Sequence, residues 1–384
     1  MSMSRGHRLE AGGTGRSARA SRMLVVLLGL AMVLAGCGVP GTIATGGSLP
    51  PIPPTPQATP LPPVRFPQDE APHHDLTEWW YYTGHLEGKD ASGQTHTYGF
   101  EYVIFQTLRG QLPPFYAAHF AISDITRSAF HYDQRLLEEP NAVISDGTSS
   151  DGFHLAVGDW TMQGLNGHDQ LAATMQDYSL NLDLHASKPP VLHGDDGLIT
   201  IGLLGFSYYY SRTRMPLTGT ISDHGVTVQV TGLAWMDHQW GNFLTLTGGG
   251  WDWYSLQLAD QSEIMMYFLR DSSGKTVATY ATYVAPDGSA ASLPPGDFTS
   301  QALDTWTSPV TQAGYPSGWQ VTITSLKLAL TLTPELRDQE LVTTQSTGVV
   351  YWEGAVDIQG QHNGAPLSGQ GYVELTGYAA VGGA

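Results

Sequence analysis

The strongest constraint on the fold is a series of short alternating segments that begins near His73 and continues to the C-terminus, with almost no helical periodicity. Residues two apart in a strand lie on the same face of a sheet, so this alternation indicates half-buried β-strands. The segments are 78–87, 98–105, 116–122, 153–157, 178–185, 219–230, 233–240, 251–258, 263–270, 276–284, 319–324, 326–332, 349–358 and 371–375. Turn sequences separate them, for example at 271–274, 286–288 and 361–364. The pattern predicts an all-β barrel or sandwich.

This β-rich region spans about 310 residues, which is long for one small barrel. Its composition breaks at 245–250, where Gly248-Gly249-Gly250 separates two aromatic strands. We therefore expect two domains, at 73–245 and 246–384.

The residues before His73 have a different composition. Residues 38–72 are rich in Pro, Thr and Gly, so they bury little apolar surface and favour extended polyproline conformation. We interpret 37–72 as a linker that holds the folded part away from a membrane.

The only cysteine, Cys37, follows Leu34-Ala35-Gly36, the small-residue pattern of a lipobox. Upstream, five arginines precede an apolar run at 23–35 that is too short to span a bilayer as a stable helix. This order is typical of a lipoprotein signal peptide at 1–36, with cleavage before Cys37. Acylation of Cys37 would then anchor an exported protein on the extracytoplasmic side of a membrane. An ordinary secretory signal with an unrelated cysteine is the alternative.

The net charge excludes one class of partner. Without residues 1–36, which carry five arginines and one glutamate, the chain has 12 basic and 34 acidic residues and a formal charge near −22. Such a surface repels phosphate backbones, so nucleic acid is not an expected partner. One cysteine forms no intramolecular disulfide, so stability must come from a packed core.

Three runs, 73–84, 232–241 and 251–256, place acids or histidines between large aromatic residues. Strand alternation puts side chains of each run on two opposite faces. The groups that should share a face are Glu78 with Trp80 and Tyr82, Met236 with His238 and Trp240, Trp235 with Asp237 and Gln239, and Asp252 with Tyr254, away from Trp251 and Trp253.

Carboxyls between aromatic rings suit general acid catalysis. Poor solvation raises the pKa of such a carboxyl and keeps it protonated, and facing rings stabilise a developing cation by about 1–2 kcal/mol each. The structural alternative is that Glu78, Asp237 and Asp252 accept hydrogen bonds from Tyr and Trp and brace the strands. The sequence alone leaves both interpretations open.

Other chemistries have weaker support. His73-His74-Asp75 could ligate a metal, but it lies at the linker junction without a spaced partner motif. The sequence contains no nucleophile elbow, dinucleotide-binding motif or P-loop. We predict neither a metal nor a cofactor.

The same runs resemble the family of carotenoid 1,2-hydratases and AttH-like proteins. The family's Thr-Glu-Trp-Trp-Tyr-x-Thr-Gly motif is similar to 77–84, and its Ala-Trp-Met-Asp-x-x-Trp-Gly motif to 234–241. Segments 208–219, 351–354 and 371–378 also resemble family sequences, so the similarity covers nearly everything after His73.

The resemblance implies two tandem lipocalin-like β-barrels and, for the hydratases, addition of water to a terminal carotenoid double bond without a cofactor. Relatives on this fold include isoflavonoid hydratases and pericyclic cyclases, so the resemblance constrains the fold more than the reaction. The hydratase His-x-Trp pair corresponds to His238 and Trp240, and Asp252 is the best match for the catalytic acid. A lipoprotein with a long linker departs from the family pattern, because the carotenoid hydratases work beside membrane-embedded synthesis.

The resulting hypothesis is a lipid-anchored protein that binds a small apolar ligand, namely a carotenoid, an isoprenoid or a lipid. Asp252 or Asp237 would protonate the alkene, and His238 would orient or deprotonate the attacking water. The side chains expected to bind the substrate are Trp240, Trp251, Tyr254, Glu78, Trp80 and Tyr82. The alternatives are a non-catalytic carrier of hydrophobic ligands and a structural envelope protein.

Overall fold

The computed structural model describes residues 61–108, 114–138, 142–144, 152–200, 205–242 and 249–379. The predicted signal peptide, Cys37 and linker residues 38–60 lie outside these residues, as do residues 243–248, where the predicted domain boundary falls. Within the described part, no helix has the length and apolar character needed to cross a membrane.

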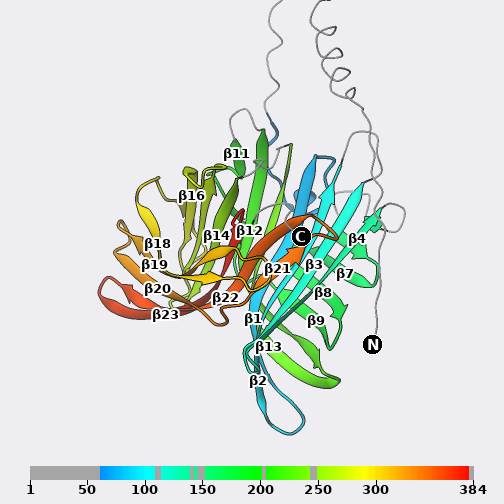
Figure 1. Ribbon diagram of the computed structural model, residues 1–384. Coiled ribbons are helices and arrows are strands. Elements are labelled where there is room, and N and C mark those ends of the chain that lie inside the picture. Colours follow the sequence, from blue (N-terminus) through cyan, green and yellow to red (C-terminus); the bar gives the residue numbers. More distant parts are fainter. Residues whose placement is uncertain are drawn as a thin grey trace, which may run out of the picture. The chain divides into compact units, whose positions relative to one another are not determined.

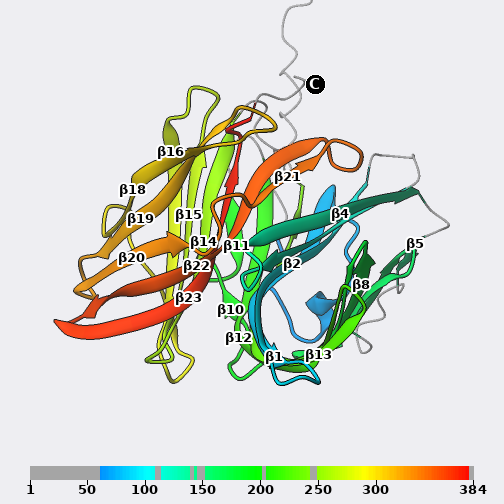
Figure 2. The ribbon, with the colours of Figure 1, turned by 60° about the horizontal axis from the view of Figure 1, so that its bottom comes forward.

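The first half of the described chain forms an antiparallel sheet with the strand order β4-β3-β2-β1-β13-β12-β9-β8-β7-β6-β5, in which β10 and β11 also pair with β12 (Figure 1). Strands β3 and β4 contact β6, so the sheet curls into a nearly closed barrel (Figure 2). The strands are β1 (Thr77–Lys89), β2 (Thr95–Thr107), β3 (Phe115–Asp124), β4 (Ala129–Glu138), β5 (Ala142–Ile144), β6 (Phe153–Val157), β7 (Trp160–Leu165), β8 (His168–Met175), β9 (Tyr178–His185), β10 (Val191–Leu192), β11 (Leu198–Thr200), β12 (Phe206–Asp223) and β13 (Val226–Gly241).

The second half forms another antiparallel sheet, with the order β17-β16-β15-β14-β23-β22-β20-β19-β18 and with β21 paired to β22. Its strands are β14 (Gly250–Leu258), β15 (Glu263–Arg270), β16 (Thr276–Val284), β17 (Ala290–Ser292), β18 (Phe298–Thr307), β19 (Gly314–Ile323), β20 (Leu328–Pro334), β21 (Glu340–Thr343), β22 (Val349–His362) and β23 (Ala365–Thr376). The predicted all-β, lipocalin-like class is therefore confirmed.

One predicted strand is wrong. The segment 219–230 crosses a hairpin turn, because β12 ends at Asp223 and β13 begins at Val226. His224 and Gly225 form the turn with φ values of 51° and 81°, the left-handed region that tight hairpins require. Alternation continues on both sides of this turn, so hydrophobic periodicity alone does not reveal it.

The packed part of the chain starts before His73. Val64 and Phe66 pack against the core of the first sheet, and Phe66 meets the Tyr210 ring edge-on with centroids 4.8 Å apart. A short 3₁₀ turn, η1 (Gln68–Glu70), follows, and Glu70 is buried. The predicted start of the folded part near His73 is therefore too late, because apolar residues within the Pro-rich region contribute to the core.

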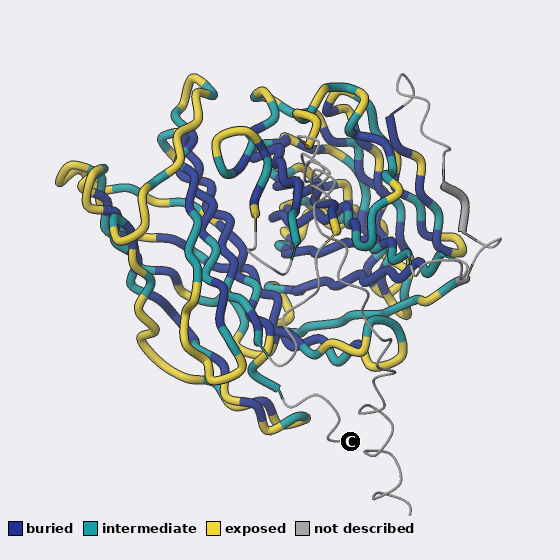
Figure 3. The backbone as a smooth tube through the Cα atoms, turned by 90° about the horizontal axis from the view of Figure 1, so that it is seen from above, coloured by how far each residue is buried: buried dark blue, intermediate teal, exposed yellow. Residues whose placement is uncertain are grey.

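Each sheet has its own buried interior, and a third buried layer lies between the sheets. Trp80 and Tyr82 belong to the interior of the first sheet and Tyr254 to that of the second. The third layer contains Tyr81 and Trp253, from the opposite faces of the same strands. Figure 3 shows buried residues along the strands of both sheets. The predicted alternation of faces therefore creates two cores and one interface.

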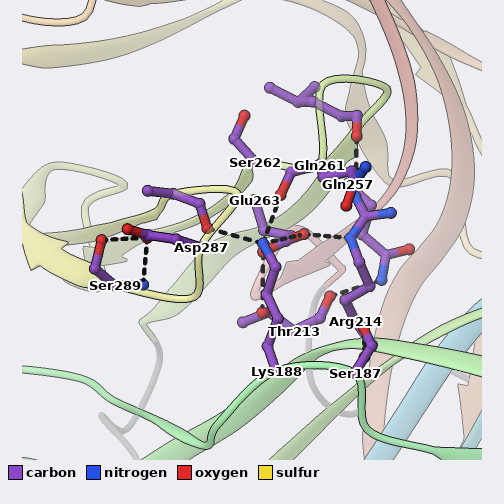
Figure 4. A network of polar contacts seen from close by, with 12 residues as sticks. Ser187, Lys188, Thr213, Arg214, Gln257, Gln261, Ser262, Glu263, Asp287 and Ser289 are labelled. Carbon is purple, nitrogen blue, oxygen red and sulfur yellow. Dashed lines mark hydrogen bonds and ion pairs between the residues drawn. The ribbon is translucent and has the colours of Figure 1, made fainter.

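A buried ion-pair network joins the two sheets (Figure 4). Lys188, between β9 and β10, places Nζ 2.8 Å from Glu263 Oε2 on β15 and donates to the Ala285 carbonyl at 2.9 Å. Arg214, on β12, pairs with the same carboxylate and donates to the Leu258 carbonyl at 2.9 Å. The buried Glu263 thus has two cationic partners from the first sheet, which fixes the contact between the sheets.

Candidate functional site

The predicted site residues divide among the three buried layers. Glu78, Trp80, His238 and Trp240 come together on the inner face of β1 and β13, where Glu78 pairs with Trp240 and Trp80 with His238 in the strand register. Asp237 faces the layer between the sheets, and Asp252 and Tyr254 belong to the second sheet. The structure therefore does not bring Asp252, Asp237 and His238 together in one catalytic centre.

The group on β1 and β13 is centred on the Glu78 carboxylate. His73 Nδ1 and His238 Nε2 both lie 2.8 Å from Glu78 Oε1. Glu78 Oε2 accepts the His73 backbone N–H at 2.8 Å and the Gln106 side-chain amide at 3.1 Å. Two imidazoles thus share one carboxylate oxygen in a continuous hydrogen-bonded chain.

Aromatic rings enclose this chain on several sides. Trp240 stacks on His73 with parallel planes and centroids 4.1 Å apart, and Trp80 stacks on His238 at 4.5 Å. Tyr208 stacks on Trp240 at 5.2 Å. The rings fix the planes of both imidazoles, and they cover His238 completely while His73 stays partly exposed.

The two histidines have opposite charge states. Burial alone would lower the pKa of His73, but hydrogen bonds and negative charge from Asp69 and Glu78 outweigh it and raise the pKa to about 9. Burial dominates at His238, which is fully inaccessible, and lowers its pKa to about 4 despite Glu78. At neutral pH the chain therefore joins a protonated His73 to a neutral His238.

His73 lines a pocket of about 390 Å³ together with Asp75, Phe206, Tyr208, Trp240 and Asn242. Asn242 donates a hydrogen bond to Asp75 at 2.7 Å. Burial raises the pKa of Asp75, although the nearby His73 charge opposes the shift. Arg65 and Asp69 also line the pocket, called the His73 pocket below, so it combines two cationic side chains, two carboxyls and aromatic walls.

Asp237 lies on the other face of β13, where it braces buried donors. It accepts hydrogen bonds from Tyr209 at 2.6 Å, from the Trp235 indole at 2.6 Å and from Ser211. Burial raises the pKa of Asp237 to about 6, although these hydrogen bonds favour the charged form. All of these contacts are internal, as the bracing interpretation predicts.

Asp252 has cationic and phenolic partners within the second sheet. Arg270 Nη2 lies 3.0 Å from Asp252 Oδ1, and the Tyr378 hydroxyl donates to the same oxygen at 3.0 Å. Burial raises the pKa of Asp252, and the charge of Arg270 opposes that shift. Tyr254 contacts Ser300 in the second core, and Trp251 donates to Glu374 at 2.9 Å.

Tyr82 is buried in the core of the first sheet and does not line the His73 pocket. Its hydroxyl donates to Asp169 at 2.8 Å, and Arg212 pairs with the buried Glu70 nearby. These contacts fill the barrel interior with side chains.

Sequence reasoning missed the central role of His73 and the contributions of Asp75, Tyr208 and Gln106. It considered His73 only as a weak metal ligand, because the residue lies before β1 and has no spaced partner in sequence. In the sequence, His73 and Glu78 are related only by lying five residues apart, on either side of the point where β1 begins. The family-like segment at 208–219 did contain Tyr208.

Two groups among the described residues have the composition of a metal site: His73 with Glu78 and His238, and His168 with Asp183 and His185. In the first, the side chains of Glu78 and His238 are completely buried, whereas all three side chains of the second group are exposed to solvent. The absence of a metal in this pocket stays a prediction.

Comparison with known proteins agrees with this architecture. A crystal structure from Nitrosomonas europaea that carries the AttH name is 31% identical to this chain, covers 84% of this chain and 99% of its own length, and superposes with a TM-score of 0.72. Kievitone hydratase from Nectria haematococca is 18% identical over 82% of this chain and 93% of its own, with a TM-score of 0.64. CghA is 11% identical over 85% of this chain and 97% of its own, with a TM-score of 0.54.

At these identities, the last two structures share the fold with this chain. Among curated proteins, none matches it. The family model for AttH-like proteins matches residues 57–378, and the chain therefore belongs to the AttH-like family.

Proposed function

We propose that the chain is an exported, lipid-anchored enzyme that adds water to a C=C bond of an apolar, isoprenoid-like molecule at the His73 pocket, without a cofactor. The observation that carries the proposal is the position of His73 at the pocket wall, where it stacks on Trp240 and hydrogen-bonds to Glu78. Membership of the AttH-like family and a fold shared with a solved hydratase support the reaction class.

The pocket suits an apolar end group. Its volume of about 390 Å³ is at the lower end of the range for small-molecule sites, so it would take a small ligand or one end of a long one. The walls supplied by Phe206, Tyr208 and Trp240 are aromatic. The terminal double bond of an acyclic carotenoid meets both requirements.

The proposed reaction begins with proton transfer from the His73 imidazolium to one alkene carbon. The π electrons form the new C–H bond and leave a tertiary cation on the adjacent carbon. Trp240 and Tyr208 line the pocket, and an aromatic ring beside such a cation stabilises it by about 1–2 kcal/mol. Water adds to the cation and loses a proton to Asp75, which returns it to His73 through solvent.

Glu78 and His238 are positioning residues in this scheme. Glu78 fixes the His73 ring through Nδ1 and stabilises its charged form. His238 is too buried to reach a substrate, and its contact with Glu78 Oε1 holds the carboxylate in place. Orientation of the acid is expected to lower the barrier because the ring does not have to reorganise during the reaction.

The test is hydration of lycopene or neurosporene in detergent, with the hydroxylated product detected by mass. Replacing His73 by Gln removes the general acid, so turnover should fall by about 10²–10⁴-fold with little change in KM. Asp75→Asn should also lower turnover. Asp252→Asn is the matched control, because this carboxyl lies in the second sheet and should not affect kcat.

The pH profile gives an independent readout. Activity should fall as pH rises through about 9, the pKa of His73, and Glu78→Gln should shift this limb to lower pH. If the unmutated chain binds such a ligand but never hydrates it, the chain is a carrier of hydrophobic ligands and the proposed enzymatic function is wrong. If His73→Gln retains full turnover, the proposed acid is wrong.

A further inference from the structure

A second group of histidines lies on strands β8 and β9, away from the His73 pocket. His168 begins β8 and His185 ends β9, and the two residues are directly opposite one another in the antiparallel register. Asp183 lies two residues before His185, so its side chain is on the same face of the strand. Three side chains from two neighbouring strands therefore share one surface.

The ring atoms of this group converge on one carboxylate. His168 Nε2 lies 3.0 Å from Asp183 Oδ2, and His185 Nε2 lies 2.6 Å from Asp183 Oδ1. The two imidazole rings stack with centroids 4.1 Å apart and an angle of 20° between their planes. The stack orients both Nε2 atoms in the same direction.

Neighbouring side chains hold this arrangement in place. Gln170, opposite Asp183 in the register, donates to Asp183 Oδ2 at 3.2 Å. Gln163 on β7 in turn donates to Gln170 Oε1 at 2.6 Å. The carboxylate is thus oriented by amides on adjacent strands, as outer-shell groups orient metal ligands.

We propose that His168, Asp183 and His185 form a binding site for a divalent transition-metal ion such as Zn²⁺ or Cu²⁺. Each residue offers one ligand atom, and these atoms all lie within 4.8 Å of one another. Two imidazole nitrogens and a carboxylate oxygen are a ligand set that both ions accept, with positions left open for water.

Exposure and charge favour such an ion. The three side chains are 54%, 37% and 62% exposed for His168, Asp183 and His185, so an ion reaches them from solvent without unfolding. Within the described residues, Asp183 contacts these histidines and Gln170, and no Lys or Arg competes for its carboxylate. The excess of acidic residues attracts cations to the surface.

Space for a further ligand is present beside the site. His168 and Gln170 line a surface hollow of about 460 Å³, together with Gln163 and His154. A small anion or carboxylate in this hollow could complete the coordination of the ion.

The experiment is titration of the full chain with Zn²⁺ alone by isothermal calorimetry, with Cu²⁺ electron paramagnetic resonance as a second readout. We expect one equivalent of Zn²⁺ to bind, and the Cu²⁺ spectrum to show coupling to two nitrogens. His168→Ala and His185→Ala should each weaken binding by at least about 10–100-fold, the typical loss when even an outer-shell group is removed. Cys37 is present in every variant, so it does not account for a difference between them.

His362→Ala is the matched control. His362 is also a partly exposed histidine paired with an aspartate, with Nδ1 3.2 Å from Asp260 Oδ2, but no second histidine of the described residues joins this pair in a potential metal site. This variant should bind Zn²⁺ like the unmutated chain. Loss of binding only in Glu78→Gln would place the ion in the His73 pocket and overturn the proposal, as would no binding by the unmutated chain. All of the site substitutions are at exposed positions, where folding is expected to tolerate them.

Discussion

Asp75 and Asp252 are both partly buried carboxyls whose pKa is raised by burial, yet their surroundings give them different roles. Asp75 lines the His73 pocket and has a neutral partner in Asn242. Asp252 has a cationic partner, Arg270, whose side chain also lies over the Tyr378 ring at 4.1 Å. The charge of Arg270 favours the ionised form of Asp252 and so opposes the protonated state that a general acid requires.

Asp252→Asn should therefore lower stability without lowering turnover. The amide leaves Arg270 with a weaker partner in a partly buried position, and we expect the free energy of unfolding to fall by about 1–3 kcal/mol. Chemical denaturation measures this change. Asp304→Asn is the control, because its pair with Arg337 is exposed to solvent and should contribute little to stability. A stable Asp252→Asn variant that has lost turnover would restore Asp252 as the catalytic acid.

The sequence predicted part of the candidate site. Strand alternation correctly placed Glu78 with Trp80, and His238 with Trp240, on common faces. It gave no information on which faces of different strands meet, because that depends on how the two sheets curl and pack. Asp237 and Asp252 were therefore assigned to one centre, although they belong to different layers. His73 was missed because it lies before β1, where strand alternation does not predict the direction of a side chain.

The turn η1 makes several buried contacts, although its sequence has no hydrophobic periodicity. It lies in Pro-rich sequence, yet Glu70 is 1% exposed and pairs with Arg212, while its second oxygen accepts the Asn166 N–H at 2.8 Å. The Glu70 carbonyl also accepts the Trp80 indole N–H at 3.2 Å. This element therefore links the entry segment to the interior of the first barrel and supports the strand that carries Glu78.

Glu70→Gln should destabilise the first barrel strongly. The amide leaves the buried Arg212 without its full counter-charge, and breaking a buried ion pair by removing one partner typically costs about 3–5 kcal/mol. Equilibrium unfolding in urea, followed by tryptophan fluorescence, measures the effect. Gln68→Ala, at an exposed position in the same turn, should change stability by less than about 0.5 kcal/mol. Equal effects of the two substitutions would mean that the ion pair contributes little.

Regular elements were predicted better than irregular ones. Strands β6, β9 and β15 have the bounds that alternation gives, because their burial alternates along the strand or their apolar residues form one run. Strands such as β18, which is largely exposed, were missed because they lack an apolar face. Strands can thus be predicted from the sequence where burial imposes an alternating or continuous apolar pattern.

The whole molecule is proposed to be tethered to a membrane through Cys37, which lies outside the described residues. Cys37→Ser should prevent acylation and move the protein from the membrane fraction to the soluble fraction, because the thiol is the group that receives the lipid. Metabolic labelling with a fatty-acid analogue is the measurement. Labelling of the variant equal to that of the unmutated protein would exclude the lipoprotein interpretation.

The layer between the sheets contains several carboxyls that burial keeps protonated. Glu353 is 1% exposed, and burial, followed by the charges of Glu374 and Glu101, raises its pKa well above the usual range. Its Oε1 accepts the Tyr81 hydroxyl at 2.8 Å, and Oε2 has no hydrogen-bond partner within the described residues. We therefore expect the free energy of unfolding to depend on pH through Glu353.

Glu353→Gln should make the chain more stable at pH 8 than the unmutated protein, while the two are alike below about pH 4. The native state keeps the Glu353 proton at pH values where the unfolded chain has released it, so the native state binds more protons and the free energy of unfolding falls as pH rises. The fall is about 1.4 kcal/mol per pH unit, beginning near the unfolded pKa of about 4.3 and ending at the raised native pKa. Glutamine keeps the acceptor for Tyr81 and has no proton to lose, so this part of the slope should disappear. Urea denaturation at pH 4, 6 and 8 measures the difference, with the exposed Glu87→Gln on β1 as the control that keeps the original slope. If the variant instead keeps the original slope between pH 4 and pH 8, the pKa of Glu353 is not raised in the native protein and the proposed pH dependence is wrong.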